Sequence, residues 1–363
     1  MKTAAEPKYI PTLDGWRGLA IVAVMASHAC GYFFAPTGVR PSPRLHAYFS
    51  QGAIGVKIFF VLSGFLICSG LVREREDTGR INLHAFYIRR AFRILPPLLV
   101  YLTVVVALGT IGLIAVSKTE IVACLLFFRN FSGGGWYTTH FWTLALEEHF
   151  YLLFPTFLAL TSKSPGRWTF ALLAGATLFR TLNATGDLLS PMLEKARAEN
   201  FFNELVLGAW FAILARSAVL RANFQRIPGR VLLIVVLPSL IYSIARPSQL
   251  ATGLVPLVLV VTIVWTSLNP RSLLGMMLEV TALRWVGRMS YSLYLWQELF
   301  FVLDVAPDAL PLGLLQRWPV APMLVLACAA CSYYLIERPS IKLGRQLAAA
   351  LSVVRRGRVR TSN

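Results

Sequence analysis

The sequence predicts an all-α fold, a polytopic membrane helical bundle, and three observations support this prediction. First, 56% of the 363 residues are hydrophobic and 14% are charged, and the mean hydropathy is +0.62, well outside the range of soluble domains. Second, apolar segments of near-spanning length recur from residue 13 to residue 337. Third, the basic residues behind the net charge of +18 lie in the breaks between these segments and near the C-terminus, as the positive-inside pattern of membrane proteins requires.

Ten apolar segments are candidate membrane spans, although some are shorter than the ~20 residues that a perpendicular span needs. Their approximate bounds are 13–34, 52–72, 94–116, 141–161, 168–182, 201–216, 231–246, 250–268, 286–304 and 319–337. A shorter apolar piece at 119–129 is either a further span or a re-entrant or interfacial helix. The arginine-rich loop 73–93 should be cytoplasmic, and only the second choice places the stretch 216–230 on the same side. We therefore expect about ten transmembrane helices with both termini cytoplasmic, in a multi-pass protein of the cell membrane.

Residues 1–345 are expected to form one membrane domain, and 346–363 a basic cytoplasmic tail. The lipid bilayer is an expected partner, and nucleic acid is not, because no basic face alternates with exposed aromatic residues. The five cysteines all fall within apolar segments. Cys328 and Cys331 have the spacing of a ligand pair but no second pair or histidine cluster, so no metal site is expected.

The first apolar segment carries Asp14, Arg17 and His28. Charged groups at membrane depth cost about 2.5–3.5 kcal/mol each, so they favour a functional hypothesis. Arg17 and His28 are eleven residues apart, which is three helical turns plus about 20°. They therefore share one face, with His28 about 16 Å further along the axis. This polar stripe is expected to face the inside of the bundle.

Glu147 lies six residues into the fourth apolar segment, which begins on the outer side under this topology. His28 lies six residues before the outer end of the first segment, 13–34. Glu147 and His28 are therefore predicted at the same depth. A histidine oriented by a carboxylate is a standard arrangement for taking a proton from a hydroxyl. The structural alternative is that His28 bonds to a backbone carbonyl and Glu147 caps a neighbouring helix.

Three arginines, Arg89, Arg90 and Arg93, precede the third apolar segment on the predicted cytoplasmic side. Arginine forks bind phosphate through two parallel hydrogen bonds, so this cluster could hold a phosphorylated donor. The alternative is contact with lipid headgroups combined with a role in fixing the topology.

Several blocks of the sequence resemble the membrane acyltransferase-3 family. The segment Asp14 to Ala20 followed by His28 is similar to that family's opening Arg-x10-His helix. The other similar blocks are residues 52–67, Arg90 to Arg93 (the Arg-x-x-Arg motif), Trp142 to Pro155, Tyr291 to Trp296 and Tyr333 to Pro339. The blocks follow one another in the family's order from residue 9 to about residue 345, while 165–280 is generic apolar sequence.

The resemblance implies an integral membrane O-acyltransferase for groups other than amino-acyl groups. Acyl-CoA, commonly acetyl-CoA, would be the co-substrate, with no covalently bound cofactor. A hydroxyl of an envelope or secreted carbohydrate, or of a related small molecule, would accept the group. By resemblance, the catalytic residues are His28 and Glu147. The implied donor-binding residues are Arg17, Arg90, Arg93, Ser63, Gly64 and Phe65, and the implied supporting residues are Asp14, Arg89, Trp142, Thr143 and Tyr291.

Three positions depart from the family pattern. Thr143 stands where serine is usual and keeps a hydroxyl. Lys57 replaces a residue that is often acidic, and Gln297 replaces a frequent histidine and cannot act as a base. Some family members carry a hydrolase-like domain after the bundle, and without it transfer is expected to finish within the membrane part or on a separate partner. A membrane transporter or exporter of a polar metabolite, using the same buried charges, is the alternative function, although no inverted repeat is evident.

Overall fold

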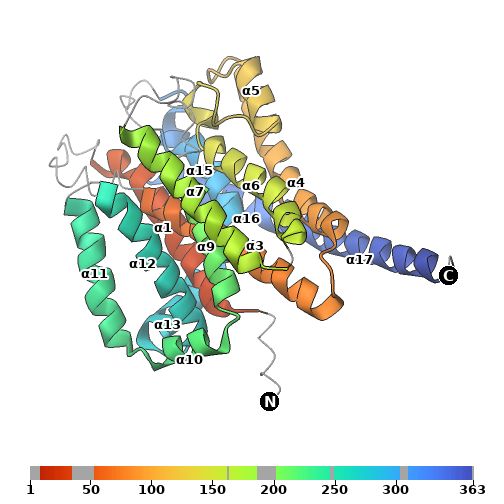
Figure 1. Ribbon diagram of the computed structural model, residues 1–363. Coiled ribbons are helices and arrows are strands. Elements are labelled where there is room, and N and C mark those ends of the chain that lie inside the picture. Colours follow the sequence, from red (N-terminus) through yellow and green to blue (C-terminus); the bar gives the residue numbers. More distant parts are fainter. Residues whose placement is uncertain are drawn as a thin grey trace.

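The computed structural model describes residues 9–34, 53–161, 163–185, 202–245, 249–302 and 310–361, and within them the regular secondary structure is helical. The long helices pack side by side (Figure 1), with α5 at one end of the bundle and α10 and α13 at the opposite end. The helices are α1 (Pro11–Phe34), α3 (Ala53–Thr78), α4 (Leu83–Thr110), α5 (Lys118–Leu125), the 3-10 turn η2 (Trp136–Thr138), α6 (Phe141–Leu160), α7 (Pro165–Thr185), α9 (Phe202–Leu214), α10 (Ala218–Arg226), α11 (Gly229–Ala245), α12 (Gln249–Leu268), α13 (Leu273–Leu278), α14 (Thr281–Arg288), α15 (Ser290–Phe300), the 3-10 turn η5 (Gly313–Gln316), α16 (Val320–Ser332), the π-helical turn η6 (Tyr333–Glu337) and α17 (Arg338–Thr361).

The all-helical prediction is confirmed for the described residues, and every one of the ten predicted segments falls on helix. The boundaries differ most at α4, which begins at Leu83, therefore includes the arginine cluster, and ends at Thr110 rather than at 116. They also differ at 286–304, which is divided between α14 and α15. The apolar piece 119–129 forms α5, which has eight residues and is too short to cross a bilayer. Helix α17 passes without a break through residue 345, so the expected tail begins inside a helix that extends away from the bundle (Figure 1).

Among the described residues, three helical segments are long and apolar enough to cross a membrane. They are Ile54–Thr78, Leu83–Thr110 and Val320–Leu351, and the bent pair α9 and α10 adds a fourth if its 101° bend lies within one broken span. Such segments support a membrane protein. Ten spans and cytoplasmic termini stay predictions.

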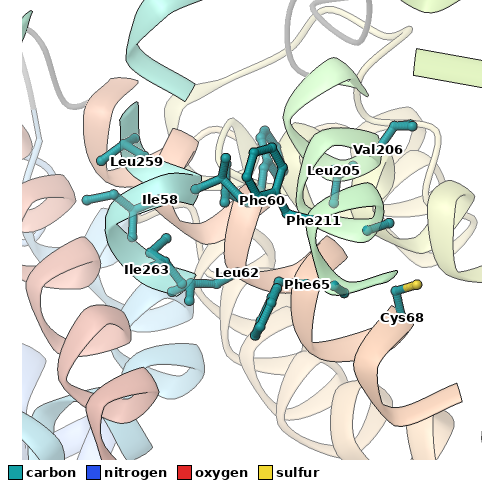
Figure 2. Close-up of a cluster of buried hydrophobic side chains, with 14 of the residues drawn as sticks. Ile58, Phe60, Leu62, Phe65, Cys68, Leu205, Val206, Phe211, Leu259 and Ile263 are labelled. Carbon is teal, nitrogen blue, oxygen red and sulfur yellow. The ribbon is translucent and has the colours of Figure 1, made fainter. Parts of the chain in front are cut away.

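Helix α3 packs against α9 at very short distance, and apolar side chains of α3, α9 and α12 surround this contact (Figure 2). A Cβ atom on Gly64 of α3 would overlap the carbonyl oxygen of Leu205, and one on Gly208 of α9 would overlap that of Val61. Only glycine permits this approach, as in close helix pairs within membranes. The contact fixes one wall of the site described below.

The segment between α5 and α6 is held by a second set of contacts. The Glu120 carboxylate accepts hydrogen bonds from the Gly135 backbone N (2.9 Å) and the Thr138 hydroxyl (2.8 Å). The Arg129 guanidinium donates to the carbonyl oxygens of Ser132 and Gly135. We call these residues the outer clamp. Because the clamp includes Thr138 of η2 and His140 follows two residues later, the clamp positions the start of α6.

Candidate active site

A cavity of about 220 Å³ lies between α1, α3, α4, α6 and α15. Its wall is otherwise largely apolar and aromatic, so the polar side chains in it stand out. Those that were predicted as site residues are Arg17, Ser63, Arg90, Arg93, Thr143, Glu147 and Tyr291. Side chains from five helices thus meet in one place, as expected of an active site rather than of scattered surface charges.

Arg90 is already neutralised by its neighbours. Its Nε donates to Glu148 Oε1 at 3.1 Å, and its terminal nitrogen lies 3.8 Å from Glu147 Oε2. The guanidinium also lies over the ring of Tyr151, 3.5 Å from the ring centre. Ser63 completes the group by donating to Glu147 Oε1 at 2.8 Å. These contacts fix the positions of the Arg90 and Glu147 side chains in the cavity wall.

Arg17 and Arg93 are placed differently. Both line the cavity, and their like charges act on each other. Within the described part of the chain, neither guanidinium has a hydrogen bond or a carboxylate within 4.0 Å, although the charge of Glu337 acts on both. Glu337 itself accepts a hydrogen bond of 2.7 Å from the Ser292 hydroxyl. The cavity therefore presents two guanidiniums that have no salt bridge among the described residues, and an anionic ligand would bind them.

The other predicted donor-binding residues do not line the cavity. Gly64 faces α9, and Phe65 belongs to the apolar core at 5% exposure. Gly64 therefore does not border this cavity, because its close neighbour is the backbone of α9. Successive helical residues point about 100° apart, so only Ser63 of this run faces inward.

Three predicted supporting residues also lie outside the cavity wall. Asp14 accepts a hydrogen bond from the Tyr9 hydroxyl (2.6 Å), and Arg89 pairs with Glu74 at 3.6 Å. Trp142 packs its ring against Phe60, with 6.3 Å between centroids. Each of these three residues thus makes a structural contact outside the cavity.

The predicted pair between His28 and Glu147 is not formed. Glu147 contacts Ser63 and Arg90, whereas His28 packs edge-on against Trp136, 5.7 Å between ring centroids. The charges that act on His28 are those of Glu298 and His140. Glu147 lies seven residues, or about 10 Å, further along α6 than His140. The predicted depth match fails because α6 begins at the level of His28 and not at the level of the end of α1.

His140 and Glu298 form a buried pair that the sequence analysis did not identify. The His140 Nδ1 atom lies 2.7 Å from Glu298 Oε2, and the two side chains are 1% and 2% exposed. The His140 backbone N also donates to the same oxygen at 3.1 Å. A glutamate inside the apolar segment 286–304 was the available signal, because such a residue is costly at membrane depth.

Comparisons with known proteins show which family the chain belongs to. A family model described as an acyltransferase domain matches residues 10–337. The chain therefore belongs to the membrane acyltransferase-3 family.

Two relatives illustrate the similarity. YrhL of Bacillus subtilis (strain 168), named as a candidate peptidoglycan O-acetyltransferase, is 27% identical over 92% of this chain and 55% of its own length. O-acetyltransferase OatA of Staphylococcus aureus (strain NCTC 8325 / PS 47) is 27% identical over 95% of this chain and 59% of its own. The chain thus spans little more than half the length of these curated relatives. No solved structure matches it.

Proposed function

We propose that the chain takes an acetyl group from acetyl-CoA at the cytoplasmic face of the membrane and transfers it to a hydroxyl of an envelope carbohydrate. The observation that carries the proposal is the pair of guanidiniums, Arg17 and Arg93, that face one cavity without a salt-bridge partner among the described residues. Coenzyme A carries phosphate groups, and arginine binds phosphate through charge-assisted hydrogen bonds. The word O-acetyltransferase in the relatives' names supports acetyl as the group.

The cavity suits the acyl end of such a donor. At about 220 Å³ it is smaller than the pockets that enclose whole drug-sized ligands, so the thioester and part of the thin arm would enter while the nucleotide stays outside. The acceptor oxygen then attacks the thioester carbonyl carbon, the carbon–sulfur bond breaks, and coenzyme A leaves as its thiol. A base must take the hydroxyl proton, and His28 is the histidine that the sequence predicts for this step.

Purified protein in lipid nanodiscs provides the test, with acetyl-CoA as donor and peptidoglycan fragments as acceptor. Thiol release and mass spectrometry of the fragments should report equal amounts of free coenzyme A and new acetyl ester. No thiol release above that of empty nanodiscs would contradict the donor assignment. Mass spectrometry of envelope carbohydrates and small molecules from cells with and without the gene identifies the acceptor, and acetyl loss confined to small molecules would contradict the carbohydrate.

A further inference from the structure

A second buried polar cluster lies near the end of α1 that approaches η2, and contains His28, His140, Gln297 and Glu298. Among the described residues, four buried atoms of this cluster have no hydrogen-bond partner within 3.5 Å: His28 Nδ1, His140 Nε2, and both amide atoms of Gln297. The Gln297 amide and the His28 ring nevertheless lie close enough to interact. An unsatisfied buried polar atom is costly, so native structures contain few of them. Several such atoms close together indicate a place where a polar ligand completes the hydrogen bonding.

His140 is the histidine of this cluster whose orientation is fixed. Glu298 accepts from the Nδ1 side of the ring at 2.7 Å, which keeps the proton on Nδ1 and leaves Nε2 as the acceptor. The rings of Tyr101, Phe141 and Tyr294 surround it, with centroids 4.7–5.4 Å away. A histidine held this way by a carboxylate is arranged to take a proton through Nε2.

Two residues that line the donor cavity contact the backbone of this histidine. Tyr294 lines the cavity, and its hydroxyl donates to the His140 carbonyl oxygen at 3.0 Å. Thr143, another cavity residue, lies 2.6 Å from the same tyrosine hydroxyl. Tyr294 and Thr143 therefore form a wall between the cavity and His140. Glu147, by contrast, is already engaged by Ser63 and Arg90.

We infer that His140, positioned by Glu298, is the base that takes the acceptor's proton, and that the acceptor hydroxyl binds among His140, His28 and Gln297. The inference rests on the proposed function and deepens it. As the hydroxyl oxygen attacks the thioester carbonyl carbon, its proton passes to His140 Nε2. When the carbon–sulfur bond breaks, the proton passes from His140 to the sulfur, so that thioester and alcohol become ester and thiol. Glu298 keeps its charge and stabilises the intermediate imidazolium.

The test compares single and double variants in the nanodisc assay with acetyl-CoA and peptidoglycan fragments. General-base catalysis contributes about 10²–10⁴-fold to a rate, so His140→Gln should lower kcat by at least about 100-fold. Glu298→Gln should also lower kcat strongly, while the KM for acetyl-CoA stays within about threefold for both. Because the two residues act as a unit, the double variant should be no slower than His140→Gln alone.

Thr262→Val is the control, since Thr262 on α12 is also buried, its hydroxyl donates within its own helix to the Val258 carbonyl oxygen, and it lies outside both the cavity and the cluster. It should keep the wild-type kcat. If Glu298→Gln keeps a kcat within threefold of wild type, or if the two losses multiply in the double variant, the inference is wrong although the acyltransferase function stands. If wild-type protein transfers no acetyl group, the proposed function fails first, so the two failures are distinguishable. Size-exclusion profiles identify variants that fail to fold, and for those the double-variant comparison is made with His140→Asn and Glu298→Asp.

Discussion

At the residue scale, the three cavity arginines differ in how their charges are compensated. Arg90 is held by Glu148, Glu147 and the ring of Tyr151. Arg17 and Arg93 face the cavity with no salt bridge among the described residues. The first arrangement maintains the wall of the site, and the second leaves charge for a ligand. Substituting the arginines should therefore separate stability from binding.

Arg17→Gln and Arg93→Gln should each raise the KM for acetyl-CoA by about 10- to 100-fold, because a hydrogen bond to a charged group contributes about 1.5–3 kcal/mol. The thermal midpoint in detergent should change little, since each substitution removes the repulsion between Arg17 and Arg93 together with an attraction to Glu337. Steady-state thiol release measures the KM, and Arg271→Gln, at an exposed position, is the control. An unchanged KM in both cavity variants would show that the phosphates bind elsewhere.

At the element scale, the contact between α3 and α9 depends on the absence of side chains. Gly208→Ala should destabilise the protein by about 3 kcal/mol or more, because its Cβ would overlap backbone atoms of Val61 and Phe65 that cannot move independently. Gly70→Ala on α3 is the matched control, since no atom lies within 4 Å of its Cβ position. Fluorescence-detected size exclusion after heating measures both. Equal midpoints for the two variants would mean that α3 and α9 do not pack this closely.

The outer clamp should depend on pH. Burial favours the neutral acid, but hydrogen bonds from Thr138, Gly135 and Ser117 outweigh it and hold the pKa of Glu120 below its usual value. A lowered folded-state pKa gives stability that is complete above the ordinary pKa of about 4.3 and is lost as the pH falls through the folded-state pKa. Hydrogen exchange at the Gly135 amide should therefore be slower in wild type than in Glu120→Gln at neutral pH, and this difference should vanish in acid. A difference that persists at low pH would contradict a role for the charge.

At the scale of the whole molecule, the apolar pattern was enough to place the helices, because span length and loop charge are local properties. The site was predicted in part. Local motifs identified Arg17 and Glu147, which do meet in one cavity. The partner of Glu147 and the surroundings of His28 depend on how far each helix is shifted along its axis relative to its neighbours. Packing between the helices decides this shift, and no local sequence pattern reports it. The charge of Glu298 within an apolar segment was a local signal. Its pairing with His140, 158 positions away, had none, because that pairing also depends on how the helices pack.

The orientation of the bundle decides on which side the donor and the acceptor enter. The end with α10 and α13 carries the basic stretches, including Arg271, and the end with α5 includes Gly133. Because basic loops stay in the cytoplasm, a cysteine at Gly133 should react with an impermeant maleimide on intact cells, whereas one at Arg271 should react only after permeabilisation. The background is a variant with all five native cysteines replaced, and Gly133 tolerates the change because nothing lies within 4 Å of its Cβ position. The reverse pattern would place the arginine-lined cavity nearer the outer face, where acyl-CoA is absent, and would require a different donor for the same site.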